Sequence, residues 1–192
     1  MAHETFDFRI LEIIKEHMKE TDSLLDIGSG PCVMLDNLDF FSTIIALDIH
    51  RPYLINRVTK SPQIIPLHAD ALSIGQLFVP KSVSAVSFFD SLEHFTKLDG
   101  IKVLREAEYI ARKHIIIYTP RGYFPQEGID HFGLNGEQYQ AHHSGWEAEE
   151  FQALGYEVII LKGQHNQLNP AFVRAFGADH EPVDALLAIK TM

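Results

Sequence analysis

The chain has 192 residues, of which 46% are hydrophobic, and a formal net charge of −10 at pH 7. This length favours one domain over residues 1–192, the apolar share excludes intrinsic disorder, and the acidic balance weighs against nucleic-acid binding. The single cysteine excludes an intrachain disulfide, and no apolar run approaches the roughly 18 residues of a membrane span, so we expect a soluble cytoplasmic protein.

The chain opens with an amphipathic pattern. Phe6, Ile10, Ile14 and Met18 recur at four-residue spacing with charged residues between them, which predicts an N-terminal helix. Seven short apolar runs follow, several of them rich in Ile and Val, as strands covered on both faces are. The predicted strands are 24–27, 44–47, 64–67, 83–89, 115–118, 158–161 and 186–189, of which the last would also suit a helix.

Helical patterns lie between these runs. The clearest covers 97–113, and a second covers 147–154, with Ser144 as its expected N-cap and Gly155 at its end. The alternation of strand and helix predicts an α/β fold, with a doubly wound and mostly parallel sheet between two layers of helices.

One long stretch, 119–143, has no regular pattern. It is longer than a plain connection needs, and loops of this length are usually functional or disordered. Its four aromatic residues (Tyr123, Phe124, Phe132 and Tyr139) favour a packed lid, although a structured loop without a function is the alternative.

A glycine-rich turn joins the first predicted strand to an expected helix. Gly28 and Gly30 allow the backbone to approach a ligand closely, and a helix N-terminus offers unpaired N–H groups. However, Val33 stands where the dinucleotide-binding fingerprint requires Gly or Ala. Asp26, two residues before the first glycine, suits a ligand with an amino group better than it suits pyrophosphate.

Two further carboxylates follow the next two predicted strands. Asp48 lies 22 residues after Asp26, and Asp70 lies another 22 residues on. At a strand end, Asp48 can accept hydrogen bonds from ribose hydroxyls, and Asp70 can accept one from an adenine amino group. Each acid alone could be a helix cap or turn residue, but three at successive strand ends predict a nucleoside site.

Three segments carry a resemblance to a known family. LLDIGSGP at 24–31, ALD at 46–48 and ADA at 69–71 resemble the cofactor half of the class I S-adenosylmethionine-dependent methyltransferases, with Cys32 at the family's usual third glycine. The resemblance implies a Rossmann-like seven-stranded sheet, order 3-2-1-4-5-7-6, with the last strand antiparallel. It also implies S-adenosylmethionine as cofactor, with the glycines beside the methionine moiety, Asp48 at the ribose, and Asp70 and Ala71 at the adenine. The expected cofactor residues are Asp26, Gly28, Ser29, Gly30, Asp48, Ile49, Asp70, Ala71, Asp90 and Ser91.

The fourth predicted strand runs into DSLEH at 90–94. This segment resembles the D-x-L-E-H ending of family members that methylate small molecules, and it departs from the N/D-P-P-Y/F motif of those that methylate exocyclic amines of bases. His94 and Glu93 are the candidate catalytic residues, with His94 as a general base because its ordinary pKa of about 6.5 lies near working pH. Two alternatives stay open: Asp90, Glu93 and His94 could gather a divalent cation, or could simply bind the cofactor and cap a helix. No metal is included in the predicted site.

The predicted substrate loop is 119–146. Donors and possible bases in it are Arg121, His131, His142 and His143, although the histidine pair could instead lie at the surface or start a helix. Trp146 is expected to anchor the core. TPRG at 119–122 and HSGW at 143–146 also resemble a group of bacterial-type small methyltransferases, which fixes no substrate. A reactive thiol at a helix N-terminus is one interpretation of Cys32, but methyl transfer needs no covalent intermediate, which favours a packing role.

These patterns predict a methyltransferase that transfers a methyl group from S-adenosylmethionine to a small-molecule acceptor by in-line displacement. Acceptor choice would come from 119–146 and the N-terminal helix. One alternative is a nicotinamide-dependent oxidoreductase, which Val33 and Asp26 disfavour. The other is a non-catalytic module that binds S-adenosylmethionine while its loop engages a protein. The sequence predicts no oligomeric state.

Overall fold

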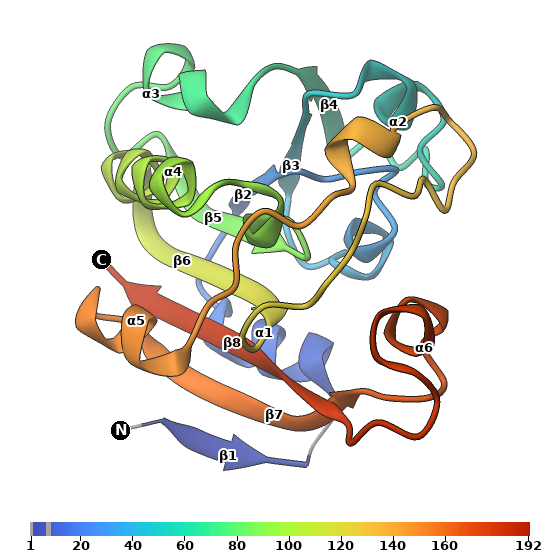
Figure 1. Cartoon of the computed structure of the whole chain (residues 1–192). Helices are drawn as coiled ribbons and strands as arrows, with labels where there is room; N and C mark the ends of the chain where they lie inside the picture. Colours follow the sequence, from blue (N-terminus) through green and yellow to red (C-terminus); the bar gives the residue numbers. More distant parts are fainter. Residues whose placement is uncertain (1, 7–8) are drawn as a thin grey trace.

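The computed structural model describes residues 2–6 and 9–192 and contains one mixed β-sheet (Figure 1). In the described part of the chain the sheet has eight strands in the order β1-β7-β8-β6-β5-β2-β3-β4. The strands are β1 (His3–Thr5), β2 (Ser23–Ile27), β3 (Thr43–Asp48), β4 (Ile64–His68), β5 (Val83–Phe89), β6 (Ala111–Pro120), β7 (Glu157–His165) and β8 (Val183–Thr191).

Short helices connect the strands. The α-helices are α1 (Ile10–His17), α2 (Arg51–Ile55), α3 (Ile74–Leu77), α4 (Lys97–Ile110), α5 (Ala148–Ala153) and α6 (Pro170–Phe176). The 3₁₀ turns are η1 (Met34–Asn37), η2 (Ala71–Ser73), η3 (Leu92–His94) and η4 (Glu137–Tyr139). Of these, α2, α3 and α6 are additions to the helices that the sequence patterns predicted.

The sheet topology confirms the expected strand order. Strand β8 pairs antiparallel with both β6 and β7, and the other pairs are parallel. If β1 is set aside, β4-β3-β2-β5-β6-β8-β7 is the expected 3-2-1-4-5-7-6 arrangement. The last apolar run is therefore a strand. β1 adds an eighth strand at the edge, parallel to β7, and its three residues carry no apolar alternation that could have predicted it.

Helices cover both faces of the sheet. Successive residues of a strand point to opposite faces, and because both sets of side chains are apolar here, both faces are buried. Leu25 and Val86 are paired neighbours in the core that contains the buried side chains of α3, α4 and α5. Leu24 and Ala85, one residue earlier on each strand, belong to the core formed with α1, η1 and α2. The expectation of helices on both faces is confirmed.

Three helix ends differ from the sequence expectations. The N-terminal helix begins at Ile10, so Phe6 precedes it and is exposed. Helix α4 ends at Ile110 rather than 113, because Ala111 adopts an extended conformation and begins β6. The N-cap of α5 is Glu147 and not Ser144, since Glu147 and Glu150 form a reciprocal capping box. Gly155 lies just after this helix, at φ +86°.

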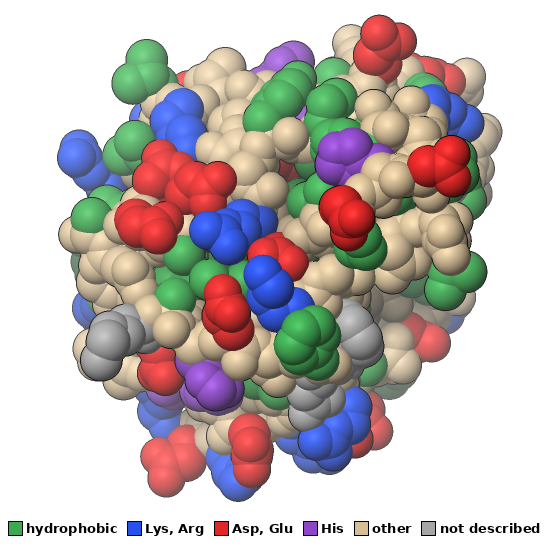
Figure 2. All heavy atoms as spheres, turned by 60° about the horizontal axis from the view of Figure 1, so that its bottom comes forward, with side chains coloured by type: hydrophobic (Ala, Val, Ile, Leu, Met, Phe, Trp, Pro, Cys, Tyr) green, Lys and Arg blue, Asp and Glu red, His purple; other side chains and the backbone are tan. Residues whose placement is uncertain are grey.

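Two further observations concern the surface and the membrane. Across residues 2–6 and 9–192, no helix combines the length and apolar character that crossing a membrane requires. Figure 2 shows Lys and Arg side chains interleaved with Asp and Glu over the face that it presents.

Candidate active site

A cavity of about 830 Å³ lies at the carboxyl ends of the central parallel strands, where ligands of open α/β sheets usually bind. Most of its wall comes from two groups of residues. One is the turn after β2 with the residues that follow β3 and β4. The other comes from η3, from the end of β7, and from residues 121–146, which we call the lid. In Figure 1 the lid runs from the end of β6 to the neighbourhood of α2 and returns to α5.

The glycine turn is tied to its neighbours by backbone contacts. The N–H groups of Gly28 and Ser29 donate to the carbonyl of Leu47 at 2.9 and 3.0 Å. A Cβ on Gly28 would lie 2.6 Å from the Cβ of Ser91, so the packing of the protein itself requires a glycine there. A Cβ on Gly30 would have nothing within 4 Å, and its φ is +52°. The turn therefore leaves open space at Gly30.

The segment after this turn corrects the sequence expectation of a helix. Only the four-residue 3₁₀ turn η1 follows, starting at Met34, and Cys32 adopts a left-handed φ of +62°. The Cys32 side chain is buried, and burial raises the pKa of its thiol to about 12. The thiol is therefore protonated at neutral pH and acts in packing, not as a nucleophile.

Asp48 connects the glycine turn to the end of β3. Its two carboxylate oxygens accept hydrogen bonds from the N–H groups of Gly30 and His50, both at 2.7 Å. Burial raises the pKa of Asp48, while these hydrogen bonds oppose the shift. Because each carboxylate oxygen has a second lone pair, Asp48 can still accept a hydrogen bond from a ligand hydroxyl in the cavity.

Asp70 lies at the end of the next strand, β4. It is exposed, lines the cavity, and caps η2 by accepting a hydrogen bond from the N–H of Leu72 at 2.9 Å. Nine of the ten expected cofactor residues line the cavity: Gly28, Ser29, Gly30, Asp48, Ile49, Asp70, Ala71, Asp90 and Ser91.

Asp26 is the expected cofactor residue that the structure places elsewhere. It lies inside the sheet, opposite Ser87 of β5, and is only 2% exposed. Its Oδ1 accepts a hydrogen bond from the Ser87 hydroxyl at 2.6 Å, and burial raises its pKa to about 6. Asp26 therefore supports the turn from within the sheet and is absent from the cavity lining.

Asp90 follows β5 in a conformation that residues other than glycine rarely adopt. Its φ is +47°, and its N–H donates to the carbonyl of Tyr118 at 2.9 Å. The carboxyl group of Asp90 faces the cavity. The protein around it displaces water, and this desolvation, together with the charge of Glu93, raises the pKa of Asp90 well above its ordinary value. Such strain recurs at functional sites.

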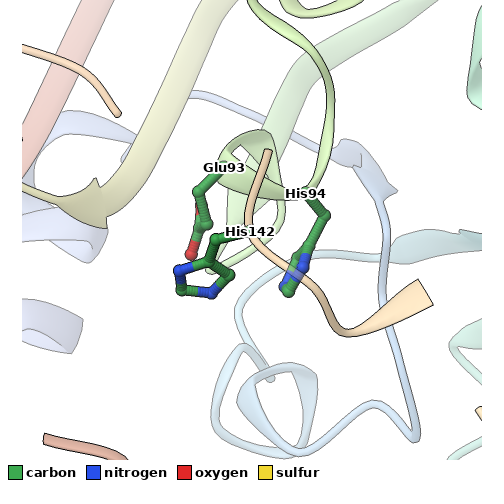
Figure 3. Close-up of side chains that lie close together, drawn as sticks. All are labelled: Glu93, His94 and His142. Carbon is green, nitrogen blue, oxygen red and sulfur yellow. The ribbon is translucent and has the colours of Figure 1, made fainter. Parts of the chain in front are cut away.

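Glu93, His94 and His142 lie together although the last comes from the lid (Figure 3). Glu93 is buried and accepts a hydrogen bond from the Thr119 hydroxyl at 2.9 Å, and burial raises its pKa to about 7. Burial lowers the pKa of His94, and it lowers that of His142 to about 4. Both imidazoles are therefore neutral at pH 7.

The expected substrate residues fall into two groups. His131 and His142 line the cavity, whereas Arg121 and His143 do not. Arg121 forms ion pairs with Glu147 at 3.0 Å and with Asp184 at 3.4 Å, which hold the start of the lid to α5 and β8. The side chain of His143 is exposed.

The lid is packed against α2 on one side. Asp130 accepts hydrogen bonds from the Tyr53 hydroxyl at 2.9 Å and from three backbone N–H groups of the lid, at residues 132, 134 and 136. The His50 ring donates from Nε2 to the carbonyl of Leu134 at 2.8 Å. At the other end, Trp146 is buried and stacks on Phe151 with ring centroids 5.2 Å apart. The expected role of Trp146 as a core anchor is confirmed.

The sequence patterns missed several residues that line the cavity. Among them are Tyr53, Phe89, Tyr118, His165 and Asn169. His165 ends β7, and its Nε2 is buried without a hydrogen-bond partner among the described residues. Burial lowers the pKa of His165 to about 4. Asn169 caps α6, and its pairing with Pro170 at the first helical position is a helix-start signal that could have located this part of the wall.

Comparisons with known proteins identify the fold. No protein-family model and no curated protein sequence matches the chain. The structure resembles that of an S-adenosylmethionine-dependent methyltransferase from Archaeoglobus fulgidus, with 16% identity, 94% of each chain covered and a TM-score of 0.58. It also resembles a candidate methyltransferase from Bacillus halodurans, with 12% identity, 96% of this chain and 98% of the other covered, and a TM-score of 0.65.

A third similar structure contains ligands. It is the 1,6-didemethyltoxoflavin-N1-methyltransferase of Burkholderia thailandensis, with bound 1,6-didemethyltoxoflavin and S-adenosylhomocysteine. The identity is 12%, the match covers 94% of this chain and 75% of the other, and the TM-score is 0.59. The chain thus has the Rossmann-like fold of the class I S-adenosylmethionine-dependent methyltransferases.

Proposed function

We propose that the protein transfers a methyl group from S-adenosylmethionine to a small-molecule acceptor. The observation that carries this proposal is the composition of the cavity, whose lining includes the glycine turn, two strand-end acids and a lid rich in aromatic and histidine side chains. The shared fold of the three similar methyltransferases supports the same conclusion.

The residues present fit a nucleoside with an attached amino acid. The open space at Gly30 leaves room beside the turn, and Asp48 retains acceptor capacity for a pair of hydroxyl groups. Asp70 and Ala71 lie at the next strand end, where an adenine ring would be held. When bound, the cofactor supplies a methyl group that is already activated by its sulfonium.

The acceptor end of the cavity combines apolar and polar groups. Phe89, Phe124, Phe132 and Tyr139 provide aromatic surface that excludes water from a bound acceptor. His165 adds an imidazole ring to this lining, and its pKa of about 4 keeps the ring neutral at pH 7. The chain would thus contribute mainly orientation and the exclusion of water.

A nicotinamide dinucleotide fits this wall less well. Its pyrophosphate usually lies at the N-terminus of an α-helix that follows the glycine turn. Here the turn leads into η1, and Val33 is 51% exposed at the cavity instead of packing a helix against the strand.

Calorimetry with S-adenosylmethionine, S-adenosylhomocysteine and NAD⁺ tests the proposal. We expect one site per chain for the two sulfur compounds and none for NAD⁺. Asp70→Asn and Asp48→Asn should each weaken S-adenosylhomocysteine binding by about 10- to 100-fold, because losing one hydrogen bond to a charged group has an effect of this size. Asp39→Asn, which changes an exposed acid outside the lining, is the matched control.

Thermal unfolding of each variant separates lost binding from lost folding, because Asp48 also holds the N–H groups of Gly30 and His50. A folded native protein that binds neither sulfur compound would overturn the proposal. A screen of acceptors for S-adenosylhomocysteine release then distinguishes an enzyme from a module that only binds the cofactor.

A further inference from the structure

Glu93, His94 and His142 form a compact group at the acceptor end of the cavity. One potential ligand atom from each lies within 4.8 Å of the other two. Ligands on opposite sides of a divalent ion lie about 4.2 Å apart when each bond is about 2.1 Å, so small side-chain shifts would close the group around an ion. We propose that these three residues bind a divalent cation; its role at the acceptor rests on the proposed function.

Hydrogen bonds fix the tautomers of both imidazoles. Nδ1 of His94 lies 3.1 Å from the carbonyl of Ala141, and Nδ1 of His142 lies 2.7 Å from the carbonyl of Phe124. A carbonyl can only accept, so each Nδ1 carries the proton and each Nε2 keeps a free lone pair. Histidines that bind metals are typically oriented in this way, by a second ring nitrogen that donates to a backbone carbonyl or carboxylate.

Glu93 supplies the negative charge of the group. Its side chain is 3% exposed, and its hydrogen bond from Thr119 occupies one of its two oxygens. Among the described residues no lysine or arginine forms an ion pair with it. A buried carboxylate is costly without a compensating charge, and a divalent cation would provide that charge.

The two chain segments that carry the group are joined by backbone hydrogen bonds. The N–H groups of His143 and Ser144 donate to the carbonyl of Glu93 at 2.9 and 3.1 Å. These bonds hold the lid segment that carries His142 against η3. Figure 3 shows the side chains of Glu93, His94 and His142 close together there. The group is therefore positioned by contacts independent of any ligand.

The donor set indicates which ions would bind. Two imidazoles and one carboxylate suit Mn²⁺, Fe²⁺, Co²⁺ or Zn²⁺ better than Ca²⁺. Three protein ligands leave coordination positions open, as in catalytic sites and unlike four-ligand structural zinc sites. All three residues line the cavity, so an acceptor oxygen could take an open position. The Nε2 lone pair of His94 would then bind the cation and would not accept a proton. The sequence suggested Asp90, Glu93 and His94 as a possible cation site. In the structure the third member of the group is His142 and not Asp90.

Metal titrations of the chelator-treated native protein test this inference. We expect saturable binding of one Mn²⁺ or Zn²⁺ per chain, followed by calorimetry. His142→Asn keeps a donor for the carbonyl of Phe124 but removes Nε2, and Glu93→Gln removes the charge. Each should weaken binding by at least about 100-fold, which exceeds the usual effect of losing an outer hydrogen bond. The control is His143→Asn, which changes the exposed neighbouring histidine and should leave the affinity unchanged.

A second measurement needs no variant. Pulsed electron paramagnetic resonance of the native Mn²⁺ complex, with ¹⁵N-labelled histidine, should show coupling to two imidazole nitrogens. No saturable binding, no nitrogen coupling, or unchanged affinity in folded His142→Asn would overturn the inference. S-adenosylhomocysteine binding is measured separately on the same samples. If S-adenosylhomocysteine binds but Mn²⁺ and Zn²⁺ do not, only the metal-site inference is contradicted. If the ions bind but S-adenosylhomocysteine does not, only the proposed function is contradicted.

Discussion

Several buried carboxyl groups lie inside or against the sheet without forming an ion pair with any described lysine or arginine. Asp26, Asp48 and Glu93 are all buried, and in the described part of the chain their hydrogen bonds come from hydroxyl and backbone N–H groups. Burial removes water from each carboxylate, and this desolvation outweighs the hydrogen bonds that the group accepts, so the pKa of each rises. Burial of these carboxyl groups therefore destabilises the fold. Asp48 and Glu93 line the cavity, where perturbed groups of this kind are common, whereas Asp26 lies behind it, inside the sheet.

Asp26 allows this cost to be measured. Its folded-state pKa of about 6 lies above its ordinary value of 3.8, so the folded state holds the proton more tightly than the unfolded state. The resulting stability is present below pH 3.8 and is lost as the pH rises to about 6. Asp26→Asn cannot ionise, and its amide oxygen can still accept the Ser87 hydrogen bond. Its free energy of unfolding relative to native should therefore increase by roughly 3 kcal/mol between these pH values.

Urea titrations of the ligand-free protein at pH 4, 5, 6 and 7 measure this difference. Asp39→Asn, at an exposed site, should show no comparable trend. A stability difference for Asp26→Asn that is constant over this range would mean that Asp26 is ionised in the folded state throughout.

The lid and α4 meet at one close contact. Trp146 lies against Gly100 of α4, and the ammonium group of Lys97 lies 3.7 Å from the indole ring centroid. The indole Nε1 donates to the Ser144 hydroxyl at 3.0 Å. Glycine has a low helix propensity, but its lack of a side chain at position 100 lets Trp146, at the end of the lid, pack directly on α4.

A pair of helical glycines tests this explanation. Gly100→Ala gains about 1 kcal/mol of helix propensity, but its Cβ would lie 2.7 Å from Cζ2 of Trp146. We expect a net loss of about 1–3 kcal/mol in the free energy of unfolding, the usual cost of overpacking. In α3, Gly75→Ala meets only the flexible end of Glu106, which can rotate away, so this control should be neutral or slightly stabilising.

Trp146→Phe removes the atom that collides with the new Cβ. In a double-mutant cycle measured by urea unfolding, Gly100→Ala should therefore cost less in the Trp146→Phe background than in the native protein. Equal costs in the two backgrounds would show that the contact does not explain the glycine.

At the scale of the whole molecule, the sheet separates two cores among the described residues. Leu104 of α4 is buried on one face, and Leu38, which follows η1, is buried on the other. Leu104→Ala and Leu38→Ala should each lower the free energy of unfolding by about 2–5 kcal/mol. Because the sheet lies between them, their effects should add within about 0.5 kcal/mol, and a single transition should persist. Two separate transitions in urea, followed by circular dichroism and tryptophan fluorescence, would show that the faces unfold independently.

The sequence by itself determined the features that depend on local chemistry. The apolar runs located the seven expected strands because burial on both faces leaves short segments rich in Ile and Val. The glycines and the acids at the strand ends located one wall of the cavity, because the carboxyl ends of parallel strands meet at one edge of the sheet. The three-residue strand β1 carried no such pattern and could not be predicted.

Only the tertiary structure decided which distant residues meet. His142 reaches Glu93 and His94 because the lid folds back onto η3, and His165 joins the cavity because β7 ends beside it. Asp26 lies inside the sheet because β2 pairs with β5 so that Ser87 is opposite it. Such contacts depend on the path of the whole chain. Local periodicity indicates which face of a strand is buried, but it does not identify the distant residue that lies opposite.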